Sequence, residues 1–386
     1  MRFKTVIYSL FLKLYKVKFK DVVIDHHKYL GKSENTLTIY DQPPRNMILS
    51  PFNISFDPMD RLLLINFEED PLYYGIELQI LHKADEFYPL VIMYRKDDLI
   101  DLYFTNETAI LNRKKKITDS LNNASFNHLE TMDYKFDVDE MGLNAYLFFK
   151  DKLENTVEVR IKENTPGKEL SAILTPINAV TKKPQYFPIV YLDKFSMVIK
   201  KDTDIFIRIN ENLRKPAELP VKINNQKFYA ARYSLNPINC NWNSSYTGNL
   251  NPILLKTDNS DLLNENLSHE ILNNKGYFEI KKVMGVDELK HSIAFEFSPA
   301  IPNLLSLKSE IEIKGKFSLI IGEKKGIFAG VYHINRKNEQ IMIRIQPTKG
   351  WQLFPGKLWL KMYMWSANIE ILENFEFKIH SNWTRV

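Results

Sequence analysis

Apolar and charged side chains alternate without a break in the stretch Val157-Glu158-Val159-Arg160-Ile161-Lys162. Successive side chains of a β-strand point to opposite faces of a sheet, so this stretch predicts a strand with one buried and one solvated face. The same period of two recurs before it, in Tyr73 to Leu81, and after it, in Asp204 to Ile209 and in Tyr277 to Val283. Turn-forming residues separate such runs, as at Asp151 to Asn155. Many short alternating runs divided by turns predict an all-β, antiparallel fold.

The domain organisation is suggested by a segment that lacks this period. Asn236 to Lys275 is rich in asparagine, whose side chain competes for backbone hydrogen bonds and favours turns. A structureless segment of that length is unusual inside one compact domain, so we place a domain boundary there. We therefore expect a larger N-terminal β-sandwich over residues 31–235, a linker over 236–275 and a smaller C-terminal domain over 276–386.

The C-terminal domain is expected to be a barrel or sandwich of lipocalin size, because seven alternating runs follow one another with short turns. The last two of these runs are Lys357 to Trp365 and Ile369 to His380. Helices are expected at few places. A short one is predicted over Asp261 to Leu272 in the linker, and residues 107–130 are the main candidate for an inserted helix or loop.

Residues 1–30 are expected to form an amphipathic helix and its lead-in. Apolar side chains from Phe3 to Val17 fall on one stripe at helical spacing, and Arg2, Lys13, Lys16 and Lys20 lie on the opposite stripe. Two interpretations remain open. The helix either docks on its own sheet or lies on a membrane surface through residues 2–20.

Charge and cysteine content exclude several classes of protein. The chain has 52 basic and 47 acidic residues among 386, and its one dense basic run is Arg113 to Lys116. A nucleic-acid interface needs a continuous basic stripe, so no nucleic-acid partner is expected. The single cysteine, Cys240, cannot form an intrachain disulfide, which fits a cytoplasmic protein. No phosphate loop or metal-ligand spacing is present, so no cofactor and no metal are expected.

Tryptophan provides the clearest sign of a binding site. Four of the five tryptophans follow residue 350, and two of them lie in the predicted strand Leu358 to Trp365. One face of that strand carries Trp359, Tyr363 and Trp365, and the other face is apolar as well. Aromatic walls with a few polar groups are typical of ligand pockets, whereas the alternative is a central strand covered by the other domain or by a partner. The candidate ligand-binding residues are Trp351, Trp359, Tyr363, Trp365 and Tyr332.

Three further positions carry chemistry that a site could use. Asp193 stands among apolar residues, where a charge is either paired with an arginine or placed at a site. His333 lies within the predicted strand Gly330 to Ile334, and the alternative is a structural or exposed histidine. Asp193 and His333 are the candidate catalytic residues. Glu77 and Gln79 share one face of their strand, which we expect to be an exposed sheet face rather than the lining of a cavity.

The expected layout of two β-domains resembles the lipocalin-like carotenoid hydratases and the related cyclisation enzymes of natural-product pathways. The resemblance lies in layout and length. It implies binding of an apolar small molecule, such as an isoprenoid or polyketide, with cofactor-free hydration or cyclisation as the reaction type. The alternative hypothesis is a non-catalytic interaction or scaffolding protein, in which another chain covers the apolar face.

Overall fold

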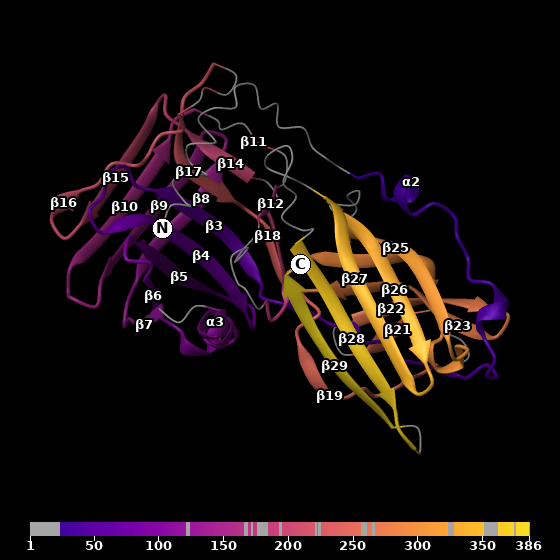
Figure 1. Ribbon diagram of the computed structural model, residues 1–386. Coiled ribbons are helices and arrows are strands. Elements are labelled where there is room, and N and C mark those ends of the chain that lie inside the picture. The colour runs from indigo at the N-terminus through magenta and orange to yellow at the C-terminus, as the bar shows by residue number, and fades with distance from the viewer. Residues whose placement is uncertain are drawn as a thin grey trace. The chain divides into compact units, whose positions relative to one another are not determined.

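The structure is a computed structural model. It describes residues 24–120, 124–165, 169–170, 173–175, 184–192, 195–220, 222, 225–255, 261–264, 267–322, 328–350, 362–373 and 376–385. These residues confirm an all-β chain of several, mostly antiparallel, sheets with few short helices (Figure 1). The helix expected within residues 1–20 lies outside the described part. Among the helices of the described residues, none is long and apolar enough to cross a bilayer.

The chain divides into two compact units, each built from separate stretches of sequence. Of the described residues, unit 1 takes Pro58–Ile173 and Tyr191–Ile238, and unit 2 takes Asp21–Asp57, Leu174–Val190 and Asn239–Val386. This division differs from the consecutive ranges expected from the sequence. The difference arises because stretches before, within and after the sequence of unit 1 supply strands to unit 2.

Unit 1 contains an eight-stranded and a five-stranded sheet. Its strands are β3 (Met59–Asn66), β4 (Tyr73–Lys83), β5 (Glu86–Arg95), β6 (Ile100–Phe104), β7 (Ala124–His128), β8 (Asp133–Asp139), β9 (Gly142–Lys150), β10 (Thr156–Glu163), β11 (Glu169–Leu170), β14 (Phe195–Ile199), β15 (Thr203–Ile209), β16 (Asn212–Leu213) and β17 (Phe228–Ser234). The larger sheet has the order β11-β14-β17-β3-β4-β5-β6-β7, and the smaller has the order β16-β15-β10-β9-β8.

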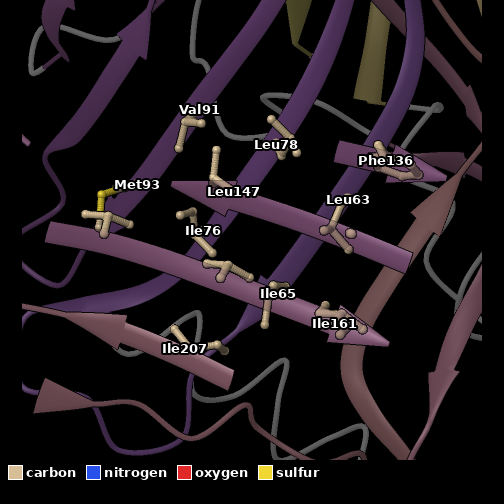
Figure 2. Packing of buried hydrophobic residues seen from close by; sticks show 14 of the residues in the cluster. Leu63, Ile65, Ile76, Leu78, Val91, Met93, Phe136, Leu147, Ile161 and Ile207 are labelled. Carbon is tan, nitrogen blue, oxygen red and sulfur yellow. The ribbon is translucent and has the colours of Figure 1, made fainter. Parts of the chain in front are cut away.

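The core of unit 1 lies between these two sheets. Leu63 and Leu78 of the larger sheet belong to one buried apolar cluster with Phe136, Leu147 and Ile161 of the smaller sheet. Figure 2 shows these side chains meeting between strands that cross one another. The alternating stretch 157–162 lies in β10, where its apolar residues are buried in this cluster. Strict alternation therefore predicted both the strand and its buried face.

Helix α3 (Glu107–Ser120) covers part of the opposite face of the eight-stranded sheet. It connects β6 to β7, which pair in parallel, and a parallel pair needs a crossover connection rather than a tight turn. Ile110 of this helix packs with Met59, Leu81 and Phe104. Residues 107–130 were expected to form an inserted helix or loop, and the structure shows helix α3 followed by strand β7 there.

Unit 2 is built on a ten-stranded antiparallel sheet. Its elements are α2 (His26–Leu30), η1 (Leu37–Ile39), β1 (Met47–Ile48), β2 (Ile54–Phe56), β19 (Tyr246–Asn249), β20 (Ile253–Leu254), β21 (Asp261–Asn264), β22 (Leu267–Asn274), β23 (Tyr277–Val286), β24 (Ser292–Ile301), η2 (Leu304–Ser306), β25 (Ile311–Ile321), β26 (Phe328–Lys337), β27 (Gln340–Gly350), β28 (Tyr363–Ile371) and β29 (Phe377–Arg385). Strands β21 to β29 follow one another in sheet order, and β19 pairs with β29 at the far edge (Figure 1). In the described residues this sheet is open, because β19 and β21 do not pair with each other.

Two smaller sheets complete the description. One pairs β1 with β20, and the other has the order β12-β13-β18-β2. The strands of this second sheet not yet described are β12 (Ile173–Thr175), β13 (Phe187–Leu192) and β18 (Pro237–Trp242).

Two expectations about unit 2 are wrong. Asp261 to Leu272 forms no helix, because its residues pair as the hairpin of β21 and β22. The expected strand Ile369 to His380 is divided between β28 and β29. The chain turns there, and the backbone N–H of Leu372 donates to the carbonyl of Glu376 at 2.8 Å.

The inner face of the ten-stranded sheet carries an aromatic core. The Trp242 ring stacks on Phe295 with centroids 3.8 Å apart, and Phe317 and Phe328 surround this pair. Phe187 of β13 packs against Phe328 and supplies a further ring. Trp242 and Phe187 come from segments that the sequence assigned to a linker and to the N-terminal domain, so this core could not be assembled from the alternation of residues 276–386 alone.

Candidate functional site

Three of the residues expected to bind a ligand lie on the inner face of the ten-stranded sheet. Tyr332, Tyr363 and Trp365 are each at most 1% exposed. Strand register places Tyr332 opposite Ile345, Ile345 opposite Trp365, and Trp365 opposite Trp383. One row of side chains therefore runs from β26 to β29 and brings Tyr332 and Trp365 onto the same surface.

Tyr332 acts in packing within this row. Its hydroxyl donates to the carbonyl of Pro299 at 2.7 Å. A Cβ atom at Gly315 would lie 2.3 Å from the Tyr332 ring, so the glycine makes room for it. Burial raises the pKa of Tyr332, and the negative charge of Glu279 raises it further. The phenol is therefore neutral and held in place.

The two tryptophans of the row differ in their hydrogen bonds. The indole N–H of Trp383 donates to the carbonyl of Asn243 at 2.6 Å. The Nε1 atom of Trp365 is buried and has no hydrogen-bond partner among the described residues. Trp383 also contacts the rings of Phe187 and Tyr363, with centroids 5.1 and 6.3 Å away. Trp383 is thus fixed within the aromatic core.

His333 does not join these residues. It follows Tyr332 directly in β26, and neighbouring residues of a strand point to opposite faces. Its Nε2 atom lies 2.8 Å from Glu312 Oε1, and Lys314 Nζ lies 3.2 Å from the same oxygen. Lys314, and to a smaller extent His333, lower the pKa of Glu312. His333 therefore belongs to an ion-pair cluster on the outer face, away from the aromatic row.

The other residues expected at a site cannot be placed. Trp351, Trp359 and Asp193 lie outside the described residues. Met362, which precedes β28, is exposed, and Met364 of β28 is half-buried, so the outer face of this strand is partly solvated where it is described.

Glu77 and Gln79 are buried, so the expectation of an exposed sheet face is wrong. Gln79 Nε2 donates to Glu77 Oε1 at 2.5 Å, and the Tyr94 hydroxyl donates to Glu77 Oε2 at 2.5 Å. Burial raises the pKa of Tyr94, the Glu77 charge raises it further, and the charges of Arg232 and Arg113 oppose the shift. This cluster satisfies the Glu77 carboxylate from within unit 1.

A groove of about 630 Å³ lies in unit 2 beside the aromatic core. It forms where the pairing of β29 with β19 ends: Tyr246 pairs with Ser381, and residues 382–385 continue beyond β19. The backbone N–H of Ser245 donates to the carbonyl of Gln185 at 2.6 Å, which holds the segment before β13 at this place. The residues that line the groove are Pro184, Gln185, Ser245, Tyr246, Thr247, His380, Ser381, Asn382, Trp383, Thr384 and Arg385.

The lining of the groove combines aromatic and polar side chains. Trp383 comes from the core, and Tyr246 is 50% exposed. Hydroxyl, amide and imidazole groups from the other lining residues supply hydrogen-bond donors and acceptors. Arg385 carries a permanent positive charge, and no aspartate or glutamate is among the described residues that line the groove.

Arg385 has few partners of its own. It is half-buried and stands opposite Tyr363 in the β28–β29 register. Its Nη2 atom lies 3.6 Å from the sulfur of Met362, a weak acceptor. Among the described residues it forms no ion pair with a carboxylate.

His380 and Thr247 form a hydrogen-bonded side-chain pair at the groove. His380 Nδ1 and Thr247 Oγ1 lie 2.7 Å apart across the β19–β29 pair. A nucleophilic hydroxyl needs a base that a third group orients. Among the described residues, Nε2 of His380 has no hydrogen-bond partner that could do so. The pair can exchange hydrogen bonds with a ligand in the groove.

Sequence analysis missed most of this groove. Ser245, Tyr246 and Thr247 lie in the segment that was interpreted as a linker. One signal was present in the sequence: alternation over Phe377 to Arg385 places an arginine on the face that carries Trp383. A single cation at the end of an apolar face is a candidate for ligand contact.

Metal binding was tested on the geometry of the described side chains. No three histidine, cysteine or acidic residues within the described part gather closely enough to hold an ion. Comparison with protein-family models, with curated proteins and with solved structures finds no match to this chain.

Proposed function

We propose that unit 2 binds a small amphipathic molecule in the groove beside Trp383. The observation that carries this proposal is a groove of about 630 Å³ in which a core tryptophan and polar side chains border the same space. Sites for small molecules typically measure about 300–1,000 Å³ and combine apolar walls with a few polar groups.

The apolar part of the ligand is expected to lie against Trp383 and Tyr246. Trp383 is held by Asn243 and by the rings of Phe187 and Tyr363, so little side-chain freedom is lost when a ligand contacts it. Tyr246 is exposed in the absence of a ligand and gains burial on binding. The sequence suggested an apolar ligand. The groove suits a ligand that has such an apolar part and also carries polar groups.

The proposal is binding rather than chemical conversion. Hydration or cyclisation without a cofactor relies on a positioned acid or base. The described lining contains no carboxyl group, and His380 is its one titratable imidazole. The up-and-down order of β21 to β29 supports a lipocalin-like interpretation of unit 2, in which ligand binding does not require a reaction.

Titration calorimetry with oleate tests this proposal, with Tyr246→Ala as the variant. We expect oleate to bind the wild-type chain and the variant to bind roughly tenfold more weakly, because a lost aromatic contact is worth about 1–2 kcal/mol. Tyr134→Ala is the matched control, since Tyr134 is a partly exposed tyrosine of unit 1. Equal binding by all three proteins, or no binding at all, would contradict the proposal.

A second candidate function is the capture of an extended peptide. In the described residues, positions 382–385 of β29 pair with β28 but have no strand partner on the β19 side. Such an edge can accept an added strand. A backbone-methylated peptide distinguishes the two functions. Methylation should abolish peptide binding if a strand is added, and oleate should compete with the unmethylated peptide, because both would occupy the edge at residues 382–385.

A further inference from the structure

We infer that the ligand of the groove is an amphipathic carboxylic acid whose carboxylate binds Arg385; this inference rests on the proposed function. The guanidinium lies at the end of the face that carries Trp383, so a molecule against the indole can reach it. The acid group and the apolar body of such a molecule then lie at adjacent positions.

Three other arginines of similar or greater burial have carboxylate or carbonyl oxygens as acceptors. Arg214 Nε lies 2.8 Å from Asp70 Oδ2, and Arg208 Nη2 lies 2.7 Å from Glu158 Oε2. The buried Arg336 donates to the carbonyls of Leu307 and Asn338. Arg385 differs from these residues, because its described acceptor is a thioether sulfur. A half-buried cation without an anion is unfavourable, and an anionic ligand would supply the missing partner.

The surroundings of Arg385 favour a carboxylate in particular. A guanidinium binds a carboxylate through two parallel hydrogen bonds. Among the described residues that line the groove, none has an acidic side chain that would compete with the ligand for the guanidinium. The amide group of Gln185, at the edge of the groove, can donate a further hydrogen bond. The charge of Arg385 is also felt at Tyr363, where it opposes the pKa increase that burial causes.

The test compares oleate with oleyl alcohol by titration calorimetry, below the concentration at which oleate forms micelles. The two probes share the apolar chain and differ in the acid group. We expect the wild-type protein to bind oleate at least about tenfold more tightly than the alcohol, since a hydrogen-bonded charge pair contributes that much or more. Arg385→Gln should lose this preference and keep its affinity for the alcohol.

Two variants serve as controls. Arg344→Gln removes an exposed arginine of β27 on the outer face and should keep the preference for oleate. Arg385→Lys keeps the charge without the planar fork and should retain part of the preference even if Arg385→Gln fails to fold. Near-ultraviolet circular dichroism establishes whether each variant is folded.

The outcomes separate this inference from the proposed function. Equal affinity of the wild-type protein for both probes, or an unchanged preference in folded Arg385→Gln, overturns the acid assignment and leaves the groove as a binding site. Failure of the wild-type protein to bind either probe overturns the proposed function itself.

Discussion

Hydrogen bonding distinguishes Trp365 from Trp383, although both are buried in one row of unit 2. Replacing Trp383 by phenylalanine leaves the carbonyl of Asn243 without its donor, whereas the same change at Trp365 removes an N–H that has no described partner. A buried group left unpaired costs about 1–3 kcal/mol. We therefore expect Trp383→Phe to lower the free energy of unfolding by that amount more than Trp365→Phe. Urea denaturation measures the difference, and equal losses would contradict the hydrogen-bond assignment.

The buried carboxyl group of Glu163 should make the stability of unit 1 depend on pH. Its carboxylate is buried and accepts hydrogen bonds from the backbone N–H groups of Leu143 and Ile199 and from the Tyr233 hydroxyl. Burial nevertheless raises the pKa of Glu163 above its ordinary value of 4.5. The folded state therefore favours the protonated carboxyl. The stability that the protonated Glu163 carboxyl contributes is fully present below the pKa that Glu163 has in the unfolded chain. It is lost as the pH rises through the higher pKa that Glu163 has in the folded chain.

Glu163→Gln tests this pH dependence, because glutamine stays neutral throughout. The difference in unfolding free energy, wild type minus variant, should fall as the pH rises from 4 to 7, by about 1.4 kcal/mol for each unit of pKa shift. Any fixed cost of the substitution adds equally at every pH. A difference that is constant, or that grows with pH, would show that the carboxylate is stabilised by its hydrogen bonds more than it is penalised by burial.

At the level of single residues, only part of the candidate site could be predicted from the sequence. Alternation placed Tyr363 and Trp365 on one face, whereas the alternation that puts Arg385 on the face of Trp383 was not used, because the last strand was expected to end at His380. Their neighbours in the groove come from residues 184–185 and 245–247, whose contacts depend on long-range pairing. His333 was considered for its chemistry without the face to which the period of two assigns it, and it lies on the face opposite Tyr332.

Helix α3 is the element whose packing gives the sharpest stability contrast. Ile110 is 2% exposed and packs against Met59 and Leu81, whereas its neighbour Leu111 is 51% exposed. Ile110→Ala should cost about 2–5 kcal/mol, because it removes buried apolar volume. Leu111→Ala should change stability by no more than about 0.5 kcal/mol. Equal effects in chemical denaturation would mean that the helix does not dock through Ile110.

Most strands could be predicted from the sequence. One face of each sheet is buried, so apolar residues recur at every second position of its strands. The failures have physical causes. Asp261 to Leu272 has apolar residues at a spacing that also fits a helix, and cross-strand pairing with β23 decides in favour of a strand. The break between β28 and β29 lacks glycine and proline, so its turn was not visible in the composition of Ile369 to His380.

At the scale of the whole molecule, the discontinuity of unit 2 has a direct consequence. A fragment of residues 276–386 contains β23 to β29 but lacks two rings of the aromatic core, those of Phe187 and Trp242, and also the ring of Phe52, which stacks on Phe297. We expect this fragment to lack cooperative unfolding and a native near-ultraviolet circular dichroism spectrum, whereas the complete chain shows both. A fragment that unfolds cooperatively would show that strands from other stretches are not needed for the core.

Ligand binding in the groove of unit 2 is the central claim, and hydrogen exchange locates it most directly. Amide exchange is followed by mass spectrometry on the complete chain with and without oleate. The account predicts slower exchange in peptides that cover residues 245–249 and 380–385, with no change in β8 to β10 of unit 1. Unchanged exchange in both groove segments under saturating oleate, or protection confined to unit 1, would contradict it.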